Sequence, residues 1–153
     1  RRRLDALLVG AVDKGVQDAL IAANGRDPVP PTARGGARKA LASVLEKIPA
    51  EYRADALFAV DRDGRVVGQV GYDAAQAFED FELGGYAAVN DALHGYLRDD
   101  TWVLGGRIYR VAARPVEYDV TQAPVGAIVG SRQVDPKFAQ ELARRTRANV
   151  AFY

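Results

Sequence analysis

The stretch Phe58–Tyr72, FAVDRDGRVVGQVGY, has to be either a metal site or a turn between two strands. Asp61, Asp63 and Gly64 have the spacing of the first half of a calcium loop. A calcium loop needs further oxygen ligands at alternating positions and usually a distal acidic residue, but here Arg65 and a run of strand-forming residues follow. The hairpin interpretation is favoured, because Asp can cap a turn and Gly can adopt a positive φ.

Short apolar runs rich in branched and aromatic residues predict the strands on both sides of this turn and later in the chain. The run at residues 127–129 is apolar at consecutive positions, so this strand should be covered on both faces. The predicted strands are ALFAV (56–60), RVVGQVGY (65–72), TWVLGG (101–106), RIYRVAARPVEY (107–118) and PVGAIVGSRQV (124–134).

Apolar residues at helical spacing predict an amphipathic helix over residues 4–23, which Asn24-Gly25 ends. The Pro/Gly-rich run at residues 26–36 reads as a connector. A second helix is predicted to follow. The apolar residues on one of its faces run from Ala37 to Ile48.

A mostly helical insertion is predicted between the hairpin and the third strand. Gly84-Gly85 interrupts it, and Tyr86, Val89, Leu93 and Leu97 have helical spacing. Near the end of the chain, Asp135 and Pro136 suit the start of another helix, and residues 149–153 read as a final strand.

The length of 153 residues fits a single domain. Residues 1–50 would be its helical part and residues 51–153 an antiparallel sheet with helices on its faces. The predicted fold class is therefore α+β.

Composition argues against several classes of partner. The formal net charge of +1, from 21 basic and 20 acidic residues, provides no overall field to attract nucleic acid or an anionic membrane. The chain has no cysteine, which excludes disulfides and thiol chemistry. It has no apolar window long enough to span a bilayer. It also has no methionine and starts at Arg1, so we expect a segment of a longer protein.

Catalytic and metal-binding patterns are weak in this sequence. His94 is the single histidine, with no Cys and no second His to complete a zinc site. The acid pairs Glu79-Asp80 and Asp99-Asp100 are predicted to lie on helices, where adjacent side chains do not converge on one point. No nucleophile elbow or phosphate loop is found. We therefore predict no catalytic residue, no metal and no cofactor, and a small hydrolase is the weakest alternative.

Three segments together resemble the extracytoplasmic Cache-type sensor domains, which are PAS-like modules of bacterial membrane receptors. They are DALFAVDRDGRVVGQVG (55–71), RIYRVAARPV (107–116) and PVGAIVGSRQVDPKFAQELARRTRANVAFY (124–153). The resemblance implies a PAS-like antiparallel sheet with a long N-terminal helix and a helical insertion. It also implies a periplasmic location between two membrane helices that lie outside this chain.

The same resemblance implies that a ligand binds between the sheet and the insertion. Period-two alternation puts Arg110 and Arg114 on one face of the strand at residues 107–116, where they are candidates for a carboxylate clamp. The alternative is that both arginines pair with acidic residues of a covering helix. Trp102 and Tyr109 are candidate aromatic walls or, equally, core residues. The opposite wall would be formed by Tyr86, Asn90 and His94.

The sequence thus predicts a periplasmic small-molecule-sensing domain of a membrane-bound signalling protein, such as a sensor histidine kinase. The candidate ligand bears a carboxylate. The apolar stripe of the first helix either packs on the sheet or pairs with a second subunit, and the resemblance favours a homodimer in the intact receptor. The alternative function is that of a cytosolic PAS-like or adaptor domain that acts through protein contacts.

Overall fold

The computed structural model describes residues 5–72, 78–104 and 106–134. Its centre is a five-stranded antiparallel sheet with the strand order β2-β1-β5-β4-β3. The chain crosses from β2, at one edge, to β3, at the other edge, through the insertion. The strands are β1 (Ala56–Asp61), β2 (Val66–Gly71), β3 (Arg98–Leu104), β4 (Arg107–Val116) and β5 (Gly126–Val134).

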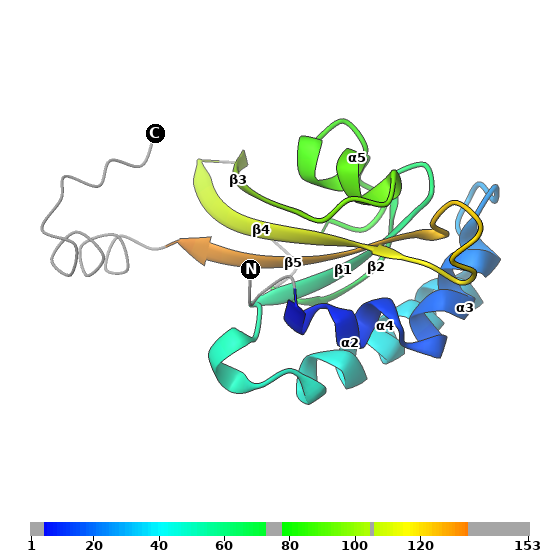
Figure 1. Ribbon diagram of the computed structural model, residues 1–153, viewed down its shortest axis with the longest axis horizontal. Coiled ribbons are helices and arrows are strands. Elements are labelled where there is room, and N and C mark those ends of the chain that lie inside the picture. Colours follow the sequence, from blue (N-terminus) through cyan, green and yellow to red (C-terminus); the bar gives the residue numbers. More distant parts are fainter. Residues whose placement is uncertain (1–4, 73–77, 105, 135–153) are drawn as a thin grey trace, which may run out of the picture.

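Helices cover both faces of this sheet (Figure 1). On one side, called here the helix face, α3 and α4 pack on β1 and β2, and α2 packs on β4 and β5. On the other side, called the insertion face, α5 packs on β3, β4 and β5. The helices are α2 (Leu8–Ala11), α3 (Lys14–Ala23), α4 (Pro31–Lys47), the 3-10 helix η1 (Ala50–Tyr52) and α5 (Ala87–Leu93). The prediction of an α+β fold with an antiparallel sheet is confirmed.

Each face of the sheet has its own hydrophobic core. Leu57 and Ile128 point to the helix face, where they pack with Leu20, Leu41 and other helix residues. On the insertion face the core is built around aromatic side chains, described below. The central strand β5 is fully buried from Ala127 to Val129, as the consecutive apolar residues predicted.

The hairpin interpretation of the DRDG stretch is confirmed. Asp61 is 1% exposed, and its Oδ1 accepts hydrogen bonds from the backbone N–H groups of Asp63 and Arg65 at 2.9 and 3.0 Å. Gly64 has a φ of 91°, and a Cβ there would lie 2.5 Å from the Cα of Gly84. Glycine is therefore required both by the turn and by the close approach of the insertion.

The single long helix predicted over residues 4–23 is wrong in one respect, because it is divided into α2 and α3. Asp13 has an extended backbone and caps α3 by accepting a 3.0 Å hydrogen bond from the N–H of Val16. The division allows α2 and α3 to follow different strands. Gly10 makes the approach of α2 possible, because a Cβ there would lie 2.2 Å from Cδ1 of Ile128.

The predicted connector at residues 26–36 is also partly wrong, since α4 already begins at Pro31. Proline is well tolerated at the first helical position, where no intrahelical partner for its missing N–H is needed. The two glycines that follow are thus part of the helix. Gly36 faces Ala19 of α3, with a virtual Cβ 4.0 Å from that methyl group.

The insertion is less helical than predicted. Its described part begins at Phe78, and α5 ends at Leu93, so Leu97 lies beyond the helix and is 48% exposed. Asp99 and Asp100, predicted on a helix, belong to β3. The predicted helix after Asp135 and Pro136 and the final strand at 149–153 lie outside the described residues.

Residues 78–83 of the insertion, called here the edge segment, pass along the outer edge of β2. The N–H of Val66 donates to Phe81 O at 3.0 Å, and the N–H of Leu83 donates to Gly64 O at 2.8 Å. Glu79 reaches α4, where its Oε2 accepts a 2.8 Å hydrogen bond from Nε of Arg38. The edge segment therefore joins the insertion to a helix on the opposite face of the sheet.

Candidate functional site

Strand β4 carries most of the predicted site, and its side chains alternate as predicted. Tyr109, Val111 and Ala113 belong to the core on the insertion face. Ala112 belongs to the core on the helix face, which places Arg110 and Arg114, at even spacing from it, on that side.

The predicted ligand-binding residues are consequently divided between the two faces of the sheet. Tyr86, Asn90, His94, Trp102 and Tyr109 are associated with the insertion, whereas the two arginines point to the helix face. The seven candidate residues therefore do not line one cavity. Alternation alone separates the arginines from the insertion, since successive residues of a strand point to opposite sides.

Trp102 lies on the insertion side, on the edge strand β3. It is 4% exposed, and its ring contacts that of Tyr86, with a centroid separation of 4.6 Å and an angle of 34° between the ring planes. Within the described part of the chain, its Nε1–H has no hydrogen-bond partner. A buried N–H without an acceptor is costly and uncommon.

Tyr109 belongs to an aromatic cluster on the same face. Its ring is 5.9 Å from Tyr72 and 6.3 Å from Phe78, which in turn contacts Phe58 at 5.3 Å. The hydroxyl of Tyr72 is 2.9 Å from Oγ of Ser131. Burial of Tyr72 raises the pKa of its hydroxyl to about 12, so the group stays protonated at neutral pH. Trp102 and Tyr109 both pack within the hydrophobic core of this face.

Asn90 and His94 lie at the outer side of α5. Both are exposed, and Nδ1 of His94 is 2.7 Å from the carbonyl oxygen of Asn90, one turn earlier. This contact is local to the end of the helix. Among the described residues, no three His, Cys, Asp or Glu side chains gather as a metal site would require.

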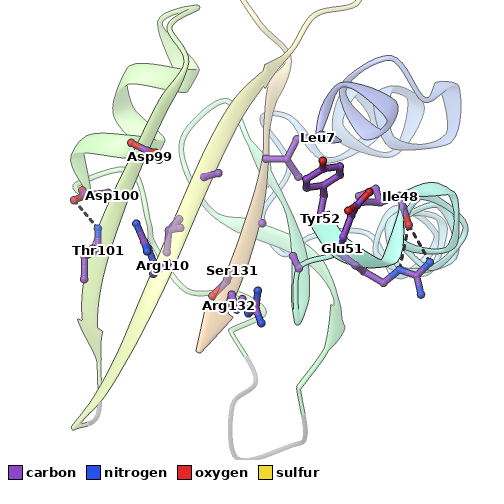
Figure 2. Close-up of a pocket in the computed structure, with 15 residues that line it drawn as sticks. Leu7, Ile48, Glu51, Tyr52, Asp99, Asp100, Thr101, Arg110, Ser131 and Arg132 are labelled. Atoms are coloured by element: carbon purple, nitrogen blue, oxygen red, sulfur yellow. Dashed lines mark hydrogen bonds between the residues drawn. The ribbon is translucent and has the colours of Figure 1, made fainter. Parts of the chain in front are cut away.

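A cavity of about 610 Å³ lies on the helix face, over β3, β4 and β5 (Figure 2). Cross-strand register places Thr101, Arg110 and Arg132 on its floor, because Thr101 pairs with Arg110, and Arg110 pairs with Arg132. The segment around η1 forms the opposite wall, which includes Ile48 and Tyr52.

Arg110 and Arg114 have different surroundings within this face. Arg110 lines the cavity, whereas Arg114 pairs across strands with Ile128 and lies outside the cavity lining. The alternative that both arginines pair with acids of a covering helix does not hold for Arg110. That side chain is exposed and makes no hydrogen bond or ion pair within the described residues.

Sequence reasoning missed Tyr72, Ser131 and Arg132. Alternation from the buried Ile128 would have placed Arg132 on the same face as Ile128, so its direction could have been predicted. Its position directly opposite Arg110 depends on the register between β4 and β5, which no local pattern specifies. Tyr72 follows the strand with a φ of 61°, a conformation that its sequence does not signal.

The strand order, the insertion between β2 and β3 and the helices on the opposite face define the class: this is the fold of Cache-like, PAS-like sensor domains. No protein-family model matches the sequence, and the search of curated proteins found no significant match. The likeness to known sensor domains is therefore seen in the structure and not in the sequence.

The solved structures that share this fold include the sensor domain of the histidine kinase DctB from V. cholerae. It matches with a TM-score of 0.63 at 16% sequence identity, covering 88% of this chain and 49% of that one. The periplasmic domain of Vibrio cholerae LuxQ matches with a TM-score of 0.51 at 13% identity, covering 96% and 65%.

A third match is the ligand-binding domain of the Campylobacter jejuni chemoreceptor Tlp3 in complex with 4-methylisoleucine. Its TM-score is 0.51 at 12% identity, with 94% of this chain and 60% of that one covered. The present chain thus spans about half the length of the DctB domain and less than two thirds of the other two. The predicted resemblance to Cache-type sensor domains is confirmed at the level of the fold.

Proposed function

We propose that this chain is the extracytoplasmic ligand-sensing domain of a membrane-bound signalling protein of the sensor histidine kinase class. The observation that supports it is the β2-β1-β5-β4-β3 sheet with its insertion, which matches sensor domains of DctB, LuxQ and Tlp3. The domain itself carries no catalysis, and kinase, cyclase or chemotaxis output resides in another part of the protein.

The insertion face is the side that responds to the ligand in this proposal. A small molecule with a hydrogen-bond acceptor would meet Nε1–H of Trp102 and contact the rings of Tyr86 and Tyr109. Binding shifts the population between two packings of the insertion on the sheet. A ligand produces such a shift only to the extent that it binds one packing more tightly than the other.

The chain offers a direct test, because Trp102 is its only tryptophan. The twenty L-amino acids and a set of small organic acids would be titrated while Trp102 fluorescence is recorded. We expect at least one compound to change the emission of the wild-type chain. Trp102→Phe keeps an aromatic side chain, although a smaller one, and removes the N–H; it should weaken binding of that compound about tenfold by calorimetry.

Val103→Ala is the matched control, because Val103 is the next residue of β3, points to the other face and is 58% exposed. It should bind as the wild type does. Equal affinity of Trp102→Phe and the wild type would remove the insertion face from the proposal.

Periplasmic placement and the adaptor alternative are distinguished by the sequence that flanks this domain in its gene. No helix in the described residues is both long and apolar enough to cross a membrane. The sensor proposal requires a segment of about 20 apolar residues on each side. If both flanks lack such a segment, the cytosolic adaptor function replaces the sensor.

The homodimer is also a proposal. The apolar stripe of α2 and α3 packs within the chain, with Leu7, Val16 and Leu20 almost fully buried. A dimer through these helices would instead use Leu8, Val12 and Ile21, which are 45%, 63% and 43% exposed. Sedimentation of the intact receptor's periplasmic region should show a dimer that Val12→Asp weakens. A monomer for the unmodified protein would exclude it.

A further inference from the structure

Four charged side chains join the edge segment to α4 around the outer edge of β2. Arg34 and Arg38 lie one turn apart on α4, and Glu79 and Asp80 are adjacent residues of the edge segment. Nε and Nη2 of Arg38 donate to the two carboxylate oxygens of Glu79, and Nη2 of Arg34 donates to Oδ1 of Asp80 at 2.5 Å. The Arg38–Glu79 pair is thus bidentate, a geometry that adds both strength and specificity.

Strand β2 holds the two partners of this contact in place. A Cβ at Gly68 would lie 2.7 Å from Cβ of Ala37 in α4, so the helix lies directly on the strand. The N–H of Gln69 donates to Glu79 at 3.2 Å, and Oε1 of Gln69 accepts a 2.7 Å hydrogen bond from the N–H of Phe78. The edge segment is therefore bonded to β2 at the same point where it contacts α4.

The apolar residues of the edge segment belong to the opposite side of the sheet. Phe78 and Leu83 are 8% and 2% exposed and are part of the core on the insertion face. The N–H of Tyr86 donates to Leu83 O at 3.1 Å, and the ring of Tyr86, at the start of α5, contacts Trp102. A change in the packing of α5 that moves Leu83 or Phe78 therefore also acts on the contact with α4.

The contact with α4 holds an unfavourable local arrangement. Asp80 has a φ of 69°, which is uncommon for a residue other than glycine and recurs at switch regions. Nη1 of Arg34 is buried 3.6 Å from Glu79 and makes no hydrogen bond within the described residues. The side chains of Arg38 and Asp80 are 54% and 63% exposed, so water can solvate both after the contact opens. The bonded and the released arrangement are thus close in free energy.

We propose that Arg34, Arg38, Glu79 and Asp80 form a latch that controls how the edge segment and α5 pack on the sheet. With the latch closed, α5 keeps the packing described above. With the latch released, the edge segment leaves α4 and α5 loosens over Trp102. The regulatory role of the latch rests on the proposed function, because the two packings between which a ligand selects are then the latched and the released one.

Native-state hydrogen exchange followed by NMR tests the latch without any ligand, since local openings expose some amides while the rest of the chain stays folded. The amides to follow are those of Val66 and Leu83, bonded across the edge of β2, and of Asn90 in α5. The amides of residues 127–129 in the central strand report global unfolding. In the wild type, the first three should exchange at similar rates and faster than residues 127–129. Equal rates for Asn90 and residues 127–129 would overturn the latch.

Arg38→Gln shows which contact keeps this opening closed. It should speed up exchange at Val66, Leu83 and Asn90 about fivefold, because the released state lacks the Arg38–Glu79 pair. Lys39→Gln is the matched control, since Lys39 is the next residue of α4, is exposed and makes no ion pair within the described residues. It should leave all rates unchanged. If Arg38→Gln does not change exchange at Asn90, α5 opens with the pair intact, and the latch is overturned.

A double variant separates the ion pair from independent effects of its members. Glu79→Gln should speed up exchange at Asn90, and Arg38→Gln combined with Glu79→Gln should do so about as much as Glu79→Gln alone, because the same pair is lost. Effects that multiply would show that the two residues act separately and would contradict the latch.

The same exchange measurement keeps the latch and the proposed function apart. A compound that changes Trp102 emission should change exchange at Val66 and at Asn90 by the same factor. A change at Asn90 alone would overturn the regulatory role of the latch while leaving ligand binding intact. If no compound changes Trp102 emission, the proposed function fails, and the ligand-free rates still decide whether the latch exists.

Discussion

The two faces of the sheet are made by the same strands but are closed in different ways. On the insertion face, aromatic side chains such as Phe58, Phe78 and Tyr109 fill the space under the insertion. On the helix face, small and branched side chains fit closely beneath α2, α3 and α4. These helices do not cover β3, where the cavity lies. Alternation therefore determines which way a side chain points, and the covering elements determine whether it enters a core or a cavity.

The largest expected effect is on the aromatic side of this comparison. Phe58 is 2% exposed at the centre of the insertion face. Phe58→Ala should lower the free energy of unfolding by about 3–5 kcal/mol, from lost burial and the space left behind. Urea unfolding followed by circular dichroism would measure it.

Thr101→Ala is the corresponding change on the open part of the helix face, where the side chain is exposed. It should alter stability by no more than about 0.5 kcal/mol. If Phe58→Ala and Thr101→Ala lowered the free energy of unfolding by similar amounts, both side chains would be equally well packed. The contrast between the two faces would then be wrong.

A second prediction concerns the close fit of α2 on the helix face. Gly10→Ala would put a methyl group 2.2 Å from Cδ1 of Ile128 and 3.1 Å from Cγ1 of Val44. Despite the better helix propensity of Ala, this overpacking should cost about 1–3 kcal/mol. Thermal denaturation would detect it as a lower melting temperature.

Gly35→Ala provides the control, because that glycine lies in α4 and a Cβ there meets no atom within 4 Å. It should stabilise the chain by about 0.5–1 kcal/mol through its effect on the helix and the unfolded state. If both substitutions stabilise the chain, α2 does not pack on β5 as closely as described.

The smallest effect is expected where the edge segment connects the two faces. The hydrogen bond from Arg38, aided by the charges of Arg38 and Arg34, lowers the pKa of Glu79 below its ordinary value of 4.5. Glu79→Gln should cost about 1 kcal/mol at neutral pH, as for a partly exposed charge pair.

The lowered pKa of Glu79 also predicts how the stability difference between the wild type and Glu79→Gln changes with pH. A carboxylate with a lowered pKa in the folded state stabilises the fold at pH values above about 4.5, and this stabilisation is lost as the pH falls through the folded-state pKa. The difference between the wild type and Glu79→Gln should therefore shrink from pH 7 to about pH 3 in urea titrations. A constant difference would show that the charge of Glu79 contributes nothing.

The sequence was sufficient for the local features of the fold. Alternation and turn chemistry predicted the hairpin at Asp61–Arg65 and the faces of Arg110 and Tyr109. Local patterns failed where tertiary contacts decide the outcome: Asp13 divides the first helix, and Pro31 starts α4 inside a Pro/Gly-rich run. Single-sequence patterns carry no information on such competition between a cap and a continuous helix.

For the candidate residues, the sequence predicted the face of the strand to which each side chain points, but not their neighbours in space. Trp102 and Tyr109 are buried on the insertion face, whereas alternation puts Arg110 on the other face, where it lines the cavity. The face to which Arg132 points could be predicted, but its neighbour Arg110 could not. The identity of the neighbour depends on the register between β4 and β5.

The edge segment also affects how the sheet meets other chains. Exposed edge strands are templates for pairing and aggregation. Along β2, backbone groups of Gly64 and Val66 are already bonded to residues 80–83, and the N–H of Gln69 donates to Glu79 at 3.2 Å. The opposite edge, β3, begins with the charged run Arg98–Asp100. One edge is thus occupied and the other begins with charge, which opposes fibre-like growth of the sheet.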